Sequence, residues 1–353
     1  MRRMNTNKAR PTITNIAERA GVSRPTVSQV LNQKGRLSDA TRERVLKAAA
    51  DLGYRPNSYA RAIANQSTGN LGMLLSADAG RSMLLSGLMN GMQDAVIDNR
   101  MHLVVGRLPD EELTSSKHVP RLLSEFAADG LLINYFKNIP RDMRKLIADA
   151  AIPVVWINAK VVKPCVFPDD RGAGFEAANH LITLGCKRIV FVATRWMPGD
   201  KPLHYSVKDR QAGYERAMKA AGLEPRTVLA INRLTNQTTP ADRRVEQVGE
   251  ELFGSGQEVD AVITYGDAEA VVVALAAERF GIAPGVDVKI STFTLSPSQS
   301  LAFPATVWRI PMREVGYRAV QTLVRMVRGV NPTKSELRQS IPFGEPDLPL
   351  IGE

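Results

Sequence analysis

The sequence is poor in the residues that build metal and disulfide sites. Two cysteines and four histidines occur among 353 residues, and Cys165 and Cys186 do not have metal-ligand spacing. This excludes a disulfide-stabilised scaffold and a cysteine-based zinc site. Gly-x-Ser-x-Gly, Walker and His-Glu-x-x-His motifs are also missing. We therefore expect no metal, no cofactor and no enzymatic activity.

Long hydrophobic runs are missing as well. The longest, such as Ala270–Ala277, fall far short of the roughly 20 apolar residues that a membrane span needs. The segment Met1–Asn5 leads into polar residues without the apolar stretch of a secretion signal. We expect a cytoplasmic protein that has no membrane partner.

The positive charge is unevenly distributed. Residues 1–70 hold 13 lysines and arginines against four acidic residues, whereas residues 71–353 hold 33 against 32. Nearly all of the net charge of +10 therefore lies in the first segment. A basic segment attached to a neutral body, with 44% apolar residues overall to form packed cores, predicts a polyanionic partner for that segment.

Residues 12–52 have the periodicity of three short helices. Thr12 is suited to cap the first helix, Gly21 ends it, and Ser23 can cap a second helix that runs through Asn32. A third helix is expected at about Asp39–Leu52. Two short helices joined by a glycine turn and braced by a third form the helix-turn-helix pattern. From spacing alone, an ordinary three-helix bundle with a solvated polar face stays open as the alternative.

Four blocks of this segment carry a family resemblance: Thr12–Ala17, Gly21–Asn32, Thr41–Val45 and Leu52–Asn57. Together they resemble the opening of the LacI/GalR transcriptional repressors over some 55 residues. The resemblance implies a sequence-specific DNA-binding regulator. It also implies that the exposed face of the second helix enters the major groove of an operator.

The resemblance implies that Arg24, Pro25 and Gln29 read the operator bases. Proline offers only apolar contact, such as to a thymine methyl, and glutamine favours adenine where the family commonly has arginine. Polar side chains of the same segment are then expected to contact DNA phosphates. These are Thr12, Ser23, Thr26, Ser28, Asn32 and Tyr54.

Residues 58–69 are expected to form a hinge and linker after a DNA-binding domain at 10–57. So short a segment is not stable as an isolated helix. The resemblance implies that it becomes helical when two copies meet in the minor groove, with contacts from Asn57, Ala60 and Ile63. Ile63 stands where the family usually has a leucine that wedges into a base step. An incidental linker residue is the alternative at that position.

From Leu71 onward, short apolar runs alternate with amphipathic helices, which predicts parallel sheets covered by helices on both faces. The number of elements favours an α/β core of two Rossmann-like subdomains at 70–353. This core resembles the bilobed effector-binding core of the family, which is similar to periplasmic sugar-binding proteins. We expect lobe 1 at about 70–160 and 305–331, and lobe 2 at about 161–297 and 335–347.

Ligands in such folds bind at the carboxyl ends of strands, between the lobes. The resemblance assigns effector contacts to Arg210, Asn158, Asp267 and Thr294. A salt bridge to a neighbouring acid is the alternative for Arg210, and a helix cap is the alternative for Asp267. Thr294 stands where the family commonly has an acidic residue that binds sugar hydroxyls, so an anionic or phosphorylated effector is as plausible as a sugar.

These expectations combine into one function. A homodimer would place two recognition helices on a pseudo-palindromic operator, and a small molecule bound in the core would control it. Because no heptad repeat is found near Glu353, a coiled-coil tetramer is not expected. The alternative is a solute-binding protein or an enzyme on the same bilobed core, but it leaves the basic first segment unexplained.

Overall fold

The computed structural model divides the chain into two compact units, Met1–Thr68 and Gly69–Glu353. Each unit has a hydrophobic core of its own. The residues that the structure describes are 11–31, 35–54, 67–78, 81–109, 128–135, 139–149, 152–160, 162–195, 204–231, 241–254, 256, 258–295 and 301–349. Within these ranges, no helix is both long and apolar enough to cross a membrane.

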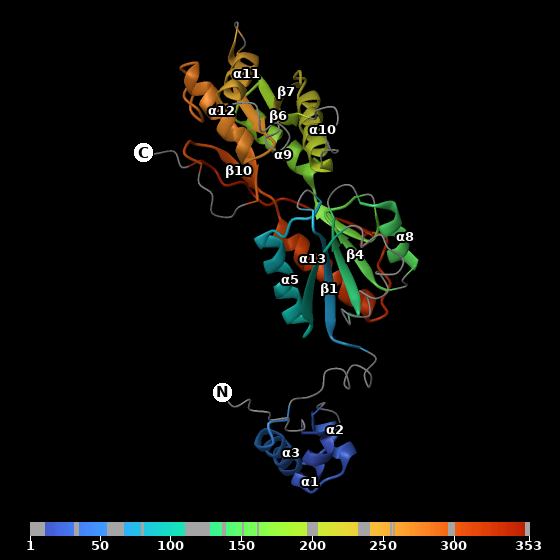
Figure 1. Cartoon of the computed structure of the whole chain (residues 1–353). Coiled ribbons are helices and arrows are strands. Elements are labelled where there is room, and N and C mark those ends of the chain that lie inside the picture. The colour runs from blue at the N-terminus through green and yellow to red at the C-terminus, as the bar shows by residue number, and fades with distance from the viewer. Residues whose placement is uncertain are drawn as a thin grey trace, which may run out of the picture. The chain divides into compact units, whose positions relative to one another are not determined.

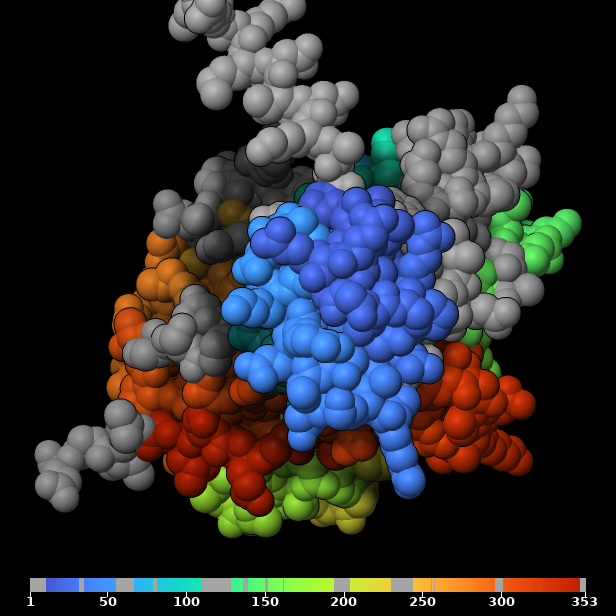
Figure 2. Space-filling view, turned by 90° about the horizontal axis from the view of Figure 1, so that it is seen from below, coloured from blue at the N-terminus to red at the C-terminus, as the bar shows by residue number. Residues whose placement is uncertain are grey.

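The described residues of the first unit, here called the head, contain three helices: α1 (Ile13–Ala20), α2 (Arg24–Leu31) and α3 (Asp39–Asp51). Ile16 and Val45, from α1 and α3, are completely buried against each other's helices together with Val27 of α2. In Figure 2 the blue residues of the head form one continuous surface. The predicted three-helix pattern is confirmed.

The turn between α1 and α2 depends on Gly21. Its φ of +61° lies in the left-handed region, which L side chains rarely adopt. Its N–H reaches back to the carbonyl oxygen of Glu18, and the next N–H, of Val22, donates to Ala17 at 3.1 Å. These bonds close the end of α1 and turn the chain directly into α2.

Six parallel strands form the sheet of lobe 1, in the order β11-β5-β4-β3-β1-β2. They are β1 (Asn70–Ser76), β2 (His102–Leu108), β3 (Gly130–Asn134), β4 (Val154–Ile157), β5 (Cys165–Pro168) and β11 (Arg338–Ile341). Helices α5 (Ser86–Asp98) and α13 (Met312–Val327) cover one face, and α8 (Arg141–Asp149) packs on the other. Strands covered on both faces are buried and mostly apolar, as β3 and β4 are, and Asn134 at the end of β3 is the one polar residue of these two strands.

Five parallel strands form the sheet of lobe 2, in the order β10-β9-β8-β6-β7. They are β6 (Ile189–Arg195), β7 (Arg226–Ile231), β8 (Ala261–Thr264), β9 (Lys289–Thr294) and β10 (Thr306–Arg309). Helices α9 (Asp170–Thr183) and α10 (Tyr205–Ala220) cover one face. Helices α11 (Ala241–Phe253) and α12 (Asp267–Arg279) cover the other (Figure 1). The predicted core of two parallel-sheet subdomains is confirmed.

The lobe boundaries differ from the predicted ones. Strands β5 and β11 pair within the sheet of lobe 1, although 161–297 and 335–347 were predicted for lobe 2. Strand β10 pairs within the sheet of lobe 2, although 305–331 was predicted for lobe 1. All three are four-residue strands directly beside a crossing between lobes. Strands this short have little sequence signal, and their partner sheet is decided by backbone pairing, which the sequence does not display.

Two glycines allow α9 and α10 to touch along their backbones. A Cβ on Gly174 would lie 2.1 Å from the Arg210 carbonyl oxygen, and a Cβ on Gly213 would lie 2.1 Å from the Arg171 carbonyl oxygen. Only a residue without a side chain fits at such distances. This close crossing places the start of α9, at Asp170, beside the second turn of α10, at Arg210.

Candidate functional site

The exposed face of α2 carries the three predicted base-reading residues. Arg24, Pro25 and Gln29 are all exposed. Pro25 is the second residue of the helix, where a backbone N–H has no acceptor within the helix, so the missing donor costs the helix nothing. Two long polar side chains and one short apolar ring are therefore available on one helix face.

The serine before α2 caps that helix, as predicted. The Ser23 hydroxyl accepts from the Thr26 N–H at 3.3 Å and lies 2.8 Å from the Thr26 hydroxyl. Ser38 and Thr41 repeat this arrangement at α3, a cap that our reading of the sequence did not identify. The signal for it was present, since Ser38 directly precedes an amphipathic helical stretch.

The other predicted phosphate contacts have different surroundings. Thr12 forms a capping box with Asn15, whose side-chain oxygen accepts from the Thr12 N–H at 2.9 Å. Tyr54 packs against the hydrophobic core of the head. Thr26 and Ser28 are partly exposed on α2. Asn32 and the predicted hinge residues Asn57, Ala60 and Ile63 lie outside the described residues.

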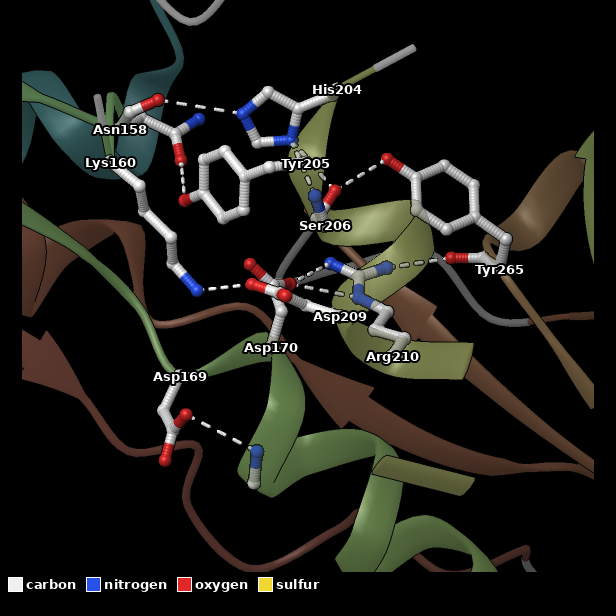
Figure 3. Close-up of polar contacts among 11 residues, drawn as sticks. Asn158, Lys160, Asp169, Asp170, His204, Tyr205, Ser206, Asp209, Arg210 and Tyr265 are labelled. Carbon is white, nitrogen blue, oxygen red and sulfur yellow. Dashed lines mark hydrogen bonds and ion pairs between the residues drawn. The ribbon is translucent and has the colours of Figure 1, made fainter. Parts of the chain in front are cut away.

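In the core, Arg210 of α10 is paired with Asp170 of α9 (Figure 3). Its Nε and Nη2 atoms lie 2.9 and 2.8 Å from Oδ1 of Asp170, and its Nη1 donates to the Tyr265 carbonyl oxygen at 2.7 Å. The guanidinium carbon lies 4.4 Å from the centre of the Phe293 ring. The sequence left open a salt bridge for Arg210, and this is the contact that the structure shows.

Asp170 has a second carboxylate oxygen that is not used in this pair. The residue is 1% exposed, and within the described part of the chain its Oδ2 atom has no hydrogen-bond partner. Burial raises the pKa of Asp170, while the charge and hydrogen bonds of Arg210 oppose that increase. Asp170 thus has one oxygen held by Arg210 and a second, buried oxygen that has no partner among the described residues.

The other predicted effector residues fall into two groups. Asn158 directly follows β4 with its backbone in the left-handed region, at a φ of +55°, and its side-chain oxygen accepts from the Tyr205 hydroxyl at 2.6 Å. Asp267 accepts from the Thr294 hydroxyl at 2.8 Å, at the carboxyl ends of β8 and β9, and burial raises its pKa. Asp267 is not the helix cap, because the cap position of α12 is Gly266.

The sequence did not identify several polar residues of this cluster as candidates. Asp170, Lys160, Tyr205, Asp209 and Tyr265 all lie around Arg210 and Asn158 in Figure 3. Asp170 and Tyr265 each follow closely on a buried strand, so position was the available signal for them. For Lys160 and Asp209 the sequence held no signal, since their contact depends on how the lobes meet. The described residues contain no group of side chains suited to hold a metal ion.

Comparison with known proteins decides the family. Residues 12–57 match the family model described as "Bacterial regulatory proteins, lacI family", and residues 178–342 match the model of a periplasmic binding protein-like domain. The chain belongs to the LacI family. This LacI-family chain is a DNA-binding transcriptional regulator with an effector-binding core, not an enzyme. The enzyme alternative is therefore set aside.

Relatives match this regulator over most of its length. The HTH-type transcriptional regulator MalR of Streptococcus pneumoniae is 27% identical, over 90% of this chain and 92% of MalR. Catabolite control protein A of Priestia megaterium is 25% identical, over 93% and 98% of the two chains. The solved lac repressor dimer, bound to operator and the anti-inducer ONPF, has the same fold with a TM-score of 0.72. It is 22% identical, over 96% of this chain and 98% of that chain.

Proposed function

We propose that this regulator is a cytoplasmic repressor that binds a pseudo-palindromic operator as a homodimer and is controlled by a neutral, polyhydroxylated small molecule. The observation that carries the DNA-binding part is the exposed face of α2, where Arg24 and Gln29 flank Pro25 on a capped helix. Arg and Gln are side chains that bond base edges in the major groove. The excess of basic residues in the first 70 supports binding to phosphates.

The homodimer is supported by an exposed apolar face on α12. Val271 and Leu275, one turn apart, are 36% and 46% exposed. A second copy of the chain would cover this face and supply the second recognition helix that a palindrome requires. In the solved lac repressor, which shares this fold, the chain is a dimer on its operator.

The effector class follows from the charges around Arg210. Both cations of the cluster are already compensated, Arg210 by Asp170 and Lys160 by Asp209. An anionic ligand would have to displace a carboxylate from Arg210 or Lys160, whereas a neutral ligand would leave both ion pairs in place. The Thr294–Asp267 pair offers further hydroxyl and carboxylate groups. This pattern favours a neutral polyol over a phosphorylated metabolite.

Selection of bound duplexes from a random library tests the operator, using the purified full-length chain at moderate salt. We expect a palindrome with a fixed centre, and its half-site should reflect Arg24, Pro25 and Gln29. Failure of the full chain to enrich any sequence, with and without candidate effectors, would contradict the proposal. Melting shifts of the same protein with neutral and phosphorylated sugars test the effector class, and a shift with phosphorylated sugars alone would overturn it.

A further inference from the structure

The two lobes are joined by side chains as well as by the three chain crossings. Asn158 and Lys160 lie in the loop after β4 of lobe 1, and the facing residues lie in the first turns of α10 of lobe 2 (Figure 3). The Tyr205 hydroxyl donates to Oδ1 of Asn158 at 2.6 Å. Nε2 of His204 lies 3.5 Å from the Asn158 carbonyl oxygen. Each of these contacts spans the division between the lobes.

Lys160 provides the charged contact between the lobes. Its ammonium group forms an ion pair with Asp209, and the two side chains are only 19% and 27% exposed. The same ammonium lies 4.6 Å from the centre of the Phe167 ring, in lobe 1, and 4.6 Å from that of the Tyr205 ring, in lobe 2. One cation is thus held by a carboxylate and by one aromatic face from each lobe, in surroundings that screen charge less than open solvent does.

Asp209 and Arg210 are neighbours on α10, but they hold different parts of the core together. Arg210 pairs with Asp170 and Tyr265, so both of its partners belong to lobe 2. Asp209 pairs with Lys160, which belongs to lobe 1. The first contact stabilises a lobe and survives any movement between lobes. The second is lost when the lobes separate at this edge.

We propose that Lys160 and Asp209 form an interlobe latch, which holds the two lobes together in the protein without ligand. Side chains of the chain itself thereby bridge the lobes beside Asp170, where the effector of the proposed function would bind. An effector must compete with this latch or strengthen it, so the pair sets how strongly ligand binding moves the lobes. The latch itself does not depend on the proposed function, but its effect on DNA binding does.

The test compares K160M and D209N with the unchanged full-length protein in the absence of ligand. D209N keeps the size of the side chain, K160M shortens it by one heavy atom, and each variant removes one charge. Spin labels at K145C, exposed on α8, and K219C, exposed on α10, report the distance between the lobes. Labelled chains are diluted into unlabelled protein so that distances within one chain dominate, and the buried native cysteines remain in place. R313M is the matched control, because Arg313 pairs with Asp94 inside lobe 1.

We expect the distance between the two spin labels to increase in both variants. The ratio of closed to open molecules should fall about 5- to 30-fold, which corresponds to about one to two kcal/mol. The double variant should open no further than either single one. The latch is refuted if either variant keeps the original distances, or if R313M opens the lobes equally. Operator affinity then separates the latch from its effect on DNA binding. If the lobes open while operator affinity is unchanged, the latch is supported, but control of the head by the lobes is contradicted.

Discussion

Replacing Asp170 with asparagine is expected to destabilise lobe 2 strongly. Arg210 is 3% exposed and lies between aromatic rings, so without the carboxylate its charge would stay buried and uncompensated. Breaking a buried ion pair by removing one partner costs about 3–5 kcal/mol. Asparagine can still accept one hydrogen bond from Arg210, which places the expected loss toward the lower end of that range. Urea unfolding of the full chain, followed by tryptophan fluorescence, measures the loss because Trp308 is buried in the same lobe.

The control for this experiment is D94N. Asp94 pairs with Arg313 on the surface, where the side chains are 43% and 72% exposed, and such pairs contribute less than about 1 kcal/mol. Equal losses in D170N and D94N would refute the reasoning, because they would mean that burial adds nothing to the Arg210 pair. A loss confined to D170N, without a change in the denaturant dependence, would support it.

R210M, Y214F, G174A and Q29A test four other features. Removing Arg210 should raise the pKa of Asp170 in the folded protein further. A carboxyl group whose pKa is higher in the folded than in the unfolded state loses its contribution to stability as the pH rises through the folded-state pKa. R210M should therefore lose more stability at pH 8 than at pH 5 in urea titrations. Burial raises the pKa of Tyr214 to about 12, and its hydroxyl accepts from the Arg226 N–H at 2.8 Å. Y214F should therefore cost about 1–3 kcal/mol in unfolding experiments, and no loss would show that water replaces the hydroxyl. G174A must push α9 away from α10 and should lower the melting temperature, unlike alanine at the exposed Gly344, which has open space. Q29A should relax base preference at one operator step by about 1–3 kcal/mol and leave the salt dependence of binding unchanged, as measured by titrating single-base operator variants.

The head and most strands of the core were predictable because their signals are local. A capping residue, a glycine turn and helical periodicity occur within 12–52, and apolar runs mark strands such as β3, β4 and β8. These features act over a few residues, so the sequence displays them directly. The lobe assignments of β5, β10 and β11 depend instead on pairing with distant strands.

The candidate site was predictable only in part, because some of its contacts join residues that are distant in the sequence. Arg210 was identified from its family motif, but its partner Asp170 lies 40 positions earlier and reaches it only because α9 and α10 cross closely. The latch between Lys160 and Asp209 is harder still to predict, because in the sequence each residue resembles an ordinary surface charge. Which charges meet is a property of the packed lobes rather than of either segment.

The glycine crossings have a mechanical consequence. In lobe 1 a Cβ on Gly91 would lie 1.8 Å from the Arg313 carbonyl oxygen, so α5 and α13 touch backbone to backbone, as α9 and α10 do in lobe 2. Because closely packed interiors transmit displacement, we expect helices in such contact to move together and each lobe to turn as one body about the three crossings. Strand β1, which begins at Asn70, is the point where the chain to the head leaves lobe 1. We expect a rotation of lobe 1 to carry Asn70, the first residue of β1, along with the rest of the lobe.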